Sequence, residues 1–166
     1  MAETSLRALV IDDSALYRKF VTSVLEEIPG VEVIGIAQNG RQGLEKIRAL
    51  KPDLITLDLE MPEMDGLAML REMSVLGDQV PTIVISALSS EGAKSTNTAL
   101  QLGAFDFVAK SIDMDDLHHT LRRATDLLML RRQVQLHSGQ DAKRYAIDRI
   151  IANSPAMQTF MQQARE

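Results

Sequence analysis

The 166-residue chain contains no cysteine, no tryptophan and only three histidines. The absence of cysteine excludes disulfide bonds, thiolate nucleophiles and zinc sites with cysteine ligands, and three histidines are too few for a histidine-rich metal centre. No apolar run approaches the roughly 20 residues that span a bilayer, and the first residues lack the basic and apolar regions of a secretion signal. We therefore expect a cytoplasmic protein that has no contact with membranes.

The chain also has fewer basic residues than acidic ones. The chain has 18 Lys and Arg residues against 23 Asp and Glu residues, which gives a net charge of −5. Such a chain has no general electrostatic attraction for nucleic acid or for an anionic membrane. Apolar residues make up 45% of the sequence, and a chain of this length has enough of them to bury one domain-sized core. We expect no direct contact with nucleic acid.

Short apolar runs alternate with longer helical patterns over the first two thirds of the chain. The expected strands are rich in Val, Ile and Leu and cover residues 6–11, 31–37, 54–57, 80–85 and 104–109. The expected helices follow them at residues 15–28, 41–50, 67–76, 91–102 and 113–136. This alternation predicts an α/β fold with a parallel sheet and helices on both faces. For five strands the natural order is the flavodoxin-like 2-1-3-4-5.

Polar side chains stand at the carboxyl ends of four expected strands. Asp12 and Asp13 follow the first strand, Asp58 the third, Ser86 the fourth and Lys110 the fifth. Taken singly, each has an ordinary explanation, such as a helix cap for a lone aspartate or a solvated charge for a lone lysine. In doubly wound sheets, however, ligands bind at this edge. The coincidence at four strand ends therefore favours a functional site.

Three carboxylates in one site repel each other, by about 4 kcal/mol for a pair at ~4 Å and an effective dielectric constant of 20. Either protonation or a cation can relieve this repulsion, and a site of this size with oxygen ligands alone suits Mg²⁺ or Mn²⁺. The cation, the hydroxyl group and the ammonium group would together hold a phosphoryl group beside a carboxylate nucleophile.

The segment from Leu6 to Lys110 resembles the receiver domain of two-component response regulators. The likeness rests on Asp12-Asp13, on the run over residues 57–66, on Ser86-Ala87 and on Lys110, which stand in the family's order and spacing. Within that family the chain is most similar to the receivers of chemotaxis methylesterases. That closer likeness lies in the runs DDSALYR at 12–18, TLDLEMP at 56–62 and EGA at 91–93.

The resemblance implies that Asp58 accepts a phosphoryl group from a phosphohistidine of a sensor histidine kinase. The Mg²⁺ ligands that it implies are Asp12, Asp13, Asp58 and the backbone carbonyl of Glu60. It also implies that Lys110 pairs with the acyl phosphate, and that Ser86 and Phe107 are switch residues that move inward on phosphorylation. The chain would then be a regulatory phosphoacceptor, not an enzyme, whose only catalysis is its own phosphorylation and dephosphorylation.

One residue departs from the family pattern. Ser111 follows Lys110, where receivers usually have proline. A cis peptide bond before a residue other than proline costs ~2.5–4 kcal/mol. We therefore expect a trans bond between Lys110 and Ser111, and the usual constraint on the position of the lysine is missing.

The last expected helix carries apolar residues at heptad spacing, which is typical of a coiled coil. The stripe consists of Met114, Leu117, Leu121, Ala124 and Leu128. It predicts a homodimer in which these residues form the seam between two chains.

The chain is expected to consist of a receiver domain at residues 1–112, the extended helix at 113–136, a linker at 137–147 and a terminal segment at 148–166. The terminal segment is either the start of a truncated output domain or a terminal helix. Residues 150–158 resemble the opening of the ATPase domain of sigma-54-dependent transcription activators, and this resemblance implies the regulatory part of such an activator.

Two alternatives remain open. One is a chemotaxis-like receiver that acts by protein contact without an output domain. The other is a phosphatase-type enzyme with an aspartate nucleophile, which is the weaker because nothing in the sequence supplies a cap over a substrate. The chain contains no Gly-x-Ser-x-Gly motif, so a methylesterase centre of that kind is absent from it.

Overall fold

The computed structural model of the chain describes residues 5–87, 90–110 and 114–137. Strands and helices alternate through these ranges. The strands are β1 (Leu6–Ile11), β2 (Val31–Ala37), β3 (Leu54–Asp58), β4 (Thr82–Ser86) and β5 (Asp106–Ala109). The helices are α1 (Ala15–Glu26), α2 (Gly40–Leu50), α3 (Gly66–Leu76), α4 (Ser90–Gln101) and α5 (Met114–His137). The predicted linker beyond residue 137 and the predicted terminal segment at 148–166 lie outside the described residues.

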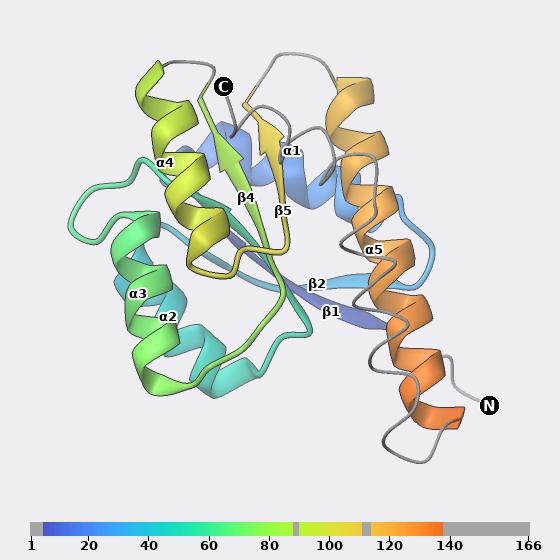
Figure 1. Ribbon diagram of the computed structural model, residues 1–166. Helices are drawn as coiled ribbons and strands as arrows, with labels where there is room; N and C mark the ends of the chain where they lie inside the picture. Colours follow the sequence, from blue (N-terminus) through green and yellow to red (C-terminus); the bar gives the residue numbers. More distant parts are fainter. Residues whose placement is uncertain (1–4, 88–89, 111–113, 138–166) are drawn as a thin grey trace, which may run out of the picture. The chain divides into compact units, whose positions relative to one another are not determined.

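All neighbouring strands are parallel, and their order across the sheet is β2-β1-β3-β4-β5. This order confirms the predicted flavodoxin-like topology. Helices α2, α3 and α4 cover one face of the sheet, and α1 and the first part of α5 lie on the other (Figure 1). Strands β3 and β4 are buried at every position, as expected for strands covered by helices on both sides.

The chain divides into two compact units, residues 1–125 and residues 126–166. The first unit holds the sheet, α1 to α4 and the first part of α5. Of the second unit the structure describes residues 126–137, which are helical. None of the described helices combines the length and the apolar character needed to span a membrane.

Two strands begin later than the sequence pattern predicts. The fourth starts at Thr82 instead of residue 80, because Pro81 has no N–H to donate to a strand ladder. The fifth starts at Asp106 instead of residue 104. There Gly103 adopts a positive φ of 101°, and the N–H of Ala104 binds the carbonyl of Ala99, so this stretch closes α4 before the strand can begin.

The predicted coiled-coil stripe of α5 is not an exposed surface. Leu117, Leu121 and Ala124 have exposed fractions of 1%, 0% and 0% and belong to the core of the first unit. Leu128, in the second unit, is 6% exposed, and the side chain of Met114 lies outside the description. Heptad spacing marks any helix that buries one face, and here at least three of the five residues pack within their own chain. Their burial favours a role in the core of this chain, and the seam between two chains remains a prediction.

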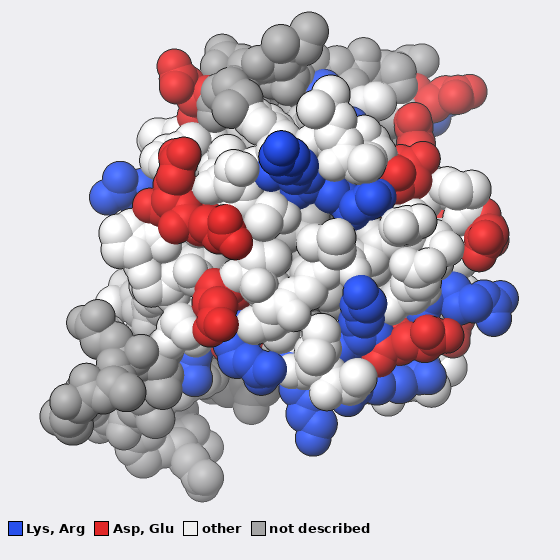
Figure 2. All heavy atoms as spheres, turned by 180° about the vertical axis from the view of Figure 1, so that it is seen from behind, with Lys and Arg blue, Asp and Glu red and all other residues white. Residues whose placement is uncertain are grey.

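Charges of both signs are mixed over one face of the molecule (Figure 2). On the face opposite to the view of Figure 1, Lys and Arg side chains lie between Asp and Glu side chains, and no large area carries one sign (Figure 2). A continuous basic stripe is the usual mark of nucleic-acid binding. This face shows none among the described residues.

Candidate functional site

The register of the sheet brings the predicted polar residues to one edge. Strands β1 and β3 are adjacent and pair Ile11 with Leu57, so Asp58 ends its strand beside the start of the Asp12-Asp13 loop. On the other side of β3, strand β4 ends at Ser86, which pairs with Ala109 of β5. Lys110 follows directly after that pair. Parallel strands thus deliver residues from four distant parts of the chain to one place.

Three carboxylates meet at this edge. Asp12, Asp13 and Asp58 each offer an oxygen atom, and these atoms all lie within 4.8 Å of one another. Asp12 and Asp58 are 1% and 2% exposed, whereas Asp13 is exposed. One carboxylate therefore faces solvent, and the other two form the floor of the site.

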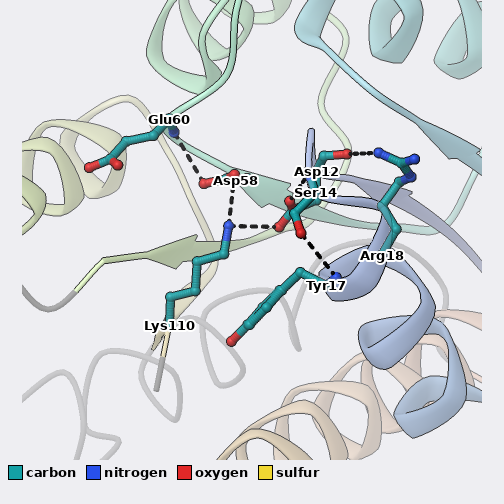
Figure 3. A network of polar contacts seen from close by, with 7 residues as sticks. All are labelled: Asp12, Ser14, Tyr17, Arg18, Asp58, Glu60 and Lys110. Atoms are coloured by element: carbon teal, nitrogen blue, oxygen red, sulfur yellow. Dashed lines mark hydrogen bonds and ion pairs between the residues drawn. The ribbon is translucent and has the colours of Figure 1, made fainter. Parts of the chain in front are cut away.

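The ammonium group of Lys110 bridges the two buried carboxylates. Its Nζ lies 2.9 Å from Oδ2 of Asp58 and 3.1 Å from Oδ2 of Asp12 (Figure 3). The Lys110 backbone N–H also donates to the Ser86 carbonyl at 2.6 Å, which fixes the base of the side chain to β4. The four charged groups together carry three negative charges and one positive charge.

Backbone donors hold the other oxygen of each buried carboxylate. The N–H of Ser14 donates to Oδ1 of Asp12 at 2.9 Å, and the N–H of Glu60 donates to Oδ1 of Asp58 at 3.1 Å. Arg18, which is nearly buried, donates to the backbone carbonyl of Asp12 at 2.6 Å. Both Oδ2 atoms are thereby left facing the centre of the site.

Burial changes the protonation behaviour of the site. It raises the pKa of Asp58 from 3.8 to about 6, and the negative charge of Asp12 adds to this effect, while Lys110 and the Glu60 N–H oppose it. For Lys110, burial favours a lower pKa, but the contacts with Asp58 and Asp12 outweigh it and raise the pKa above its ordinary value. Lys110 therefore stays charged, and Asp58 is the carboxylate that is costly to ionise without a further cation.

The donor set fits a hard divalent cation. All the side-chain ligands are carboxylate oxygens, and such ligands suit Mg²⁺ or Mn²⁺. Oδ2 of Asp12 is buried and accepts no well-directed hydrogen bond, although it lies within ion-pair distance of Lys110. An oxygen in that condition has a free lone pair to offer a metal ion. Glu60, whose carbonyl is the predicted fourth ligand, is tied to Asp58 through its own N–H.

The two predicted switch residues are turned away from Asp58. The Ser86 hydroxyl donates to the carbonyl of Gly92 at 3.1 Å, and no hydrogen bond joins it to Asp58 in the part of the chain that the structure describes. Phe107 is exposed at the surface of β5. The described residues contain no cis peptide bond, and Ser111, whose bond to Lys110 was predicted to be trans, lies outside them.

Tyr17 also belongs to the site, although the sequence analysis did not single it out. Its ring centroid lies 4.6 Å from Nζ of Lys110. The available signal was its place in the first turn of the helix that follows Asp13, at the same edge of the sheet. Arg18 was missed as well. Its buried contact with the backbone carbonyl of Asp12 cannot be read from spacing alone.

Comparisons with known proteins agree with this geometry. Residues 8–122 match the family model of the response regulator receiver domain. A protein-glutamate methylesterase/protein-glutamine glutaminase of Koribacter versatilis is 51% identical over 134 residues, covering 81% of this chain and 36% of that protein. The corresponding protein of Desulfotalea psychrophila is 53% identical over 106 residues, covering 64% of this chain and 29% of that protein. The chain thus spans about a third of the length of these relatives.

Solved structures show the same fold. The response regulator domain of Thermotoga maritima CheB superposes with a TM-score of 0.68 at 34% identity, covering 75% of this chain and 96% of that one. The signal receiver domain of a putative response regulator NarL from Mycobacterium tuberculosis gives a TM-score of 0.64 at 30% identity, covering 74% and 97%. With a family match over more than half of its length, the chain belongs to the response regulator receiver domain family.

Proposed function

We propose that the chain is a phosphoacceptor of chemotaxis-type signalling, in which Asp58 receives a phosphoryl group from a phosphohistidine of a sensor histidine kinase. The observation that carries this proposal is the meeting of Asp12, Asp13 and Asp58 with Lys110 at one edge of the sheet. The methylesterase relatives support the chemotaxis setting. A cytoplasmic location is part of this proposal, because the kinase domain that donates the phosphoryl group works there.

In the proposed reaction an oxygen of Asp58 attacks the phosphorus atom. A bond forms between that oxygen and phosphorus as the bond from phosphorus to the histidine nitrogen breaks, and the imidazole leaves with the electron pair. Mg²⁺, when bound, neutralises charge that develops on the phosphoryl oxygens. We propose that Asp12, Asp13, Asp58 and the Glu60 carbonyl hold it.

The remaining side chains stabilise the product. Lys110 already contacts Asp58, and a short movement of its ammonium would pair it with a phosphoryl oxygen. Ser86 would leave the Gly92 carbonyl and donate to another phosphoryl oxygen, and Phe107 would turn inward into the space that Ser86 vacates. Phosphorylation then acts as a population shift, because the new hydrogen bond is made in only one of the two arrangements.

The rival interpretations have less support. No relative or structure described above ties the chain to a sigma-54-dependent activator, and residues 150–158, which carried that resemblance, lie outside the described residues. We therefore favour the chemotaxis-like alternative over the activator. Methylesterase activity is named for relatives about three times as long as this chain, and the chain itself matches them as a receiver. Homodimerisation through α5 finds no support in the burial of its stripe.

Phosphorylation by a small donor tests the proposal directly. Incubation with acetyl phosphate and Mg²⁺ should add one phosphoryl group, measured by mass spectrometry of the intact protein. Asp58→Asn should abolish the addition. The matched control is Asp78→Asn, which makes the same change in the turn after α3 and should be labelled like the wild type. Labelling that persists in Asp58→Asn would refute the assignment, and many turnovers of a phosphate ester would favour the phosphatase alternative.

A further inference from the structure

The ring of Tyr17 is fixed over the side of Lys110 that the two aspartates leave free. Nζ of Lys110 lies 4.6 Å from the ring centroid (Figure 3). A cation within about 6 Å of an aromatic face is attracted by the negative potential of that face. The ammonium therefore has three partners that approach it from different directions, namely Asp58, Asp12 and the ring.

Contacts of both the backbone and the ring of Tyr17 help to place it here. The Tyr17 backbone N–H donates to Oγ of Ser14 at 3.3 Å, which is the N-cap bond of α1 and fixes the first turn of that helix. One turn later, the ring of Phe20 meets the Tyr17 ring edge to face, with centroids 5.7 Å apart and planes at 68°. Tyr17 thus belongs to the same capped turn that positions the Asp12-Asp13 loop.

The sequence around Lys110 leaves its side chain with freedom that the ring of Tyr17 can restrict. It follows a strand of only four residues, and the next residue is Ser111 where the family usually has proline. A lysine side chain has four flexible torsions, and ordering them costs about 1.5–2 kcal/mol of conformational entropy. The ring of Tyr17 beside the Lys110 side chain reduces the number of conformations open to that side chain before any phosphoryl group arrives.

We propose that Tyr17 is a positioning residue for phosphoryl transfer, whose ring face holds the Lys110 ammonium at the place where a phosphoryl oxygen of Asp58 arrives. The inference rests on the proposed role of Asp58 as phosphoacceptor. Burial raises the pKa of the Tyr17 phenol, so the ring stays uncharged at physiological pH. The ring does not touch the reacting atoms in this role and acts through Lys110.

The kinetic test separates the ring face from the phenol group and from simple packing. Tyr17→Leu keeps an apolar side chain but has no aromatic face, and the rate of phosphorylation by acetyl phosphate should fall about threefold to tenfold. Tyr17→Phe keeps the face and should restore the rate to within about twofold of the wild type. The matched control is Phe105→Leu, which removes a half-buried ring at the opposite end of β5.

Three outcomes would overturn the proposal. A wild-type rate in Tyr17→Leu would show that the ring has no role. Equal losses in Tyr17→Phe and Tyr17→Leu would move the role to the hydroxyl group. A loss in Tyr17→Leu that persists undiminished when Lys110 is replaced by methionine would show that the ring does not act through Lys110.

A spectroscopic measurement distinguishes failure of this proposal from failure of the proposed function. In the wild type and in Tyr17→Phe, the ring current should shift the NMR signals of the Lys110 ε-methylene protons upfield, and Tyr17→Leu should remove the shift. If the shift is present but the wild type takes no phosphoryl group on Asp58, the proposed function fails and the role in transfer fails with it. If phosphorylation occurs without the shift, only the role of Tyr17 is refuted.

Discussion

The hydroxyl of Ser86 donates its hydrogen bond to the carbonyl oxygen of Gly92, 3.1 Å away in α4. The Thr96 hydroxyl donates to the same carbonyl at 2.8 Å. The first turn of α4 therefore supplies the acceptor for the hydroxyl that we expect to move toward Asp58. Any movement of Ser86 toward a phosphoryl group must break this bond, which links the chemistry at β3 to the position of α4.

Replacing Gly92 should disturb this link. A Cβ atom at residue 92 would lie 2.2 Å from the backbone carbonyl oxygen of Ala87, far inside contact distance, so the backbone must shift. Gly92→Ala should therefore lower the free energy of unfolding by about 1–3 kcal/mol, although alanine is the better helix former. Urea denaturation followed by circular dichroism measures the change. The exposed neighbour Ala93→Ser is the control, and equal stability of both variants would contradict the clash.

The contribution of Asp58 to the stability of the metal-free protein should fall as the pH rises from about 4 to about 6. The folded-state pKa of Asp58 is raised to about 6 from 3.8, chiefly by burial. The folded state thus binds the proton more tightly than the unfolded state, and the stability contributed by the protonated group is lost as pH rises through the folded-state pKa. A pKa shift of this size corresponds to a change of at most about 3 kcal/mol in the free energy of unfolding.

Asp58→Asn cannot ionise and should lack this loss. Urea denaturation of both proteins across pH 4 to 7 without Mg²⁺ should show similar stability near pH 4 and a growing advantage of the variant toward pH 7. Asp78→Asn, the control, should follow the wild type. A variant that is less stable than the wild type at pH 7 would show that the ion pair with Lys110 outweighs the cost of burying the carboxylate.

Mg²⁺ should stabilise the folded state by binding at the carboxylate cluster. A ligand that binds only the folded protein adds about 2.7 kcal/mol at a hundred times its dissociation constant. The unfolding midpoint in urea should rise with Mg²⁺ in the wild type, and the rise should be much smaller in Asp13→Asn, which removes the exposed ligand of the cluster. Glu72→Gln, an exposed change on α3, should keep the full effect. An undiminished rise in Asp13→Asn would place the ion elsewhere.

The stripe on α5 should respond to mutation as core and not as an interface. Leu121 is completely buried, so Leu121→Ala should cost about 2–5 kcal/mol of unfolding free energy. Leu16→Ala is the matched control, because Leu16 is 80% exposed and its loss should cost less than about 0.5 kcal/mol. Light scattering completes the test. If the wild type is a dimer and Leu121→Ala is a folded monomer of unchanged stability, the result would support the predicted seam between two chains.

The sequence was sufficient for the fold and for the meeting of Asp12, Asp13, Asp58 and Lys110 at one edge of the sheet. Continuous apolar runs such as β3, each ending in a polar residue, define strands that are buried on both faces, and right-handed crossovers leave few orders for five of them. Once the order is known, Asp12, Asp58 and Lys110 must meet, because the ends of parallel strands lie at one edge. Periodicity and topology carry this information, and both can be read from one chain.

The sequence was not sufficient for features that depend on which partner a side chain meets. The stripe through Leu121 has the same heptad spacing whether it packs on its own domain or on a second chain, so the predicted seam did not follow from the pattern. Likewise, nothing in the spacing shows that Ser86 binds Gly92 or that Tyr17 lies over Lys110. Such contacts depend on rotamers and on the approach of elements that are distant in sequence.

Gly66 provides a test of how closely α3 must approach the phosphoacceptor strand. It is the first residue of α3, and its N–H donates to the Leu59 carbonyl at 3.1 Å. A Cβ atom here would lie 2.4 Å from the carbonyl oxygen of Asp58 and 2.8 Å from Cα of Leu59. Because both neighbours are backbone atoms, Gly66→Ala should displace the end of β3 and slow phosphorylation by acetyl phosphate, in addition to lowering stability.

Gly77 at the other end of α3 is the matched control for this prediction. It has a positive φ of 75° and open space around its Cα, so Gly77→Ala should cost about 1 kcal/mol of stability through backbone strain alone. The rate of phosphorylation should then be unchanged in Gly77→Ala and reduced in Gly66→Ala. The reduction is expected because a displaced Asp58 carboxylate could not keep its alignment with Lys110 and the metal ligands. Equal rates in the two variants would mean that the close contact between Gly66 and β3 matters for folding only.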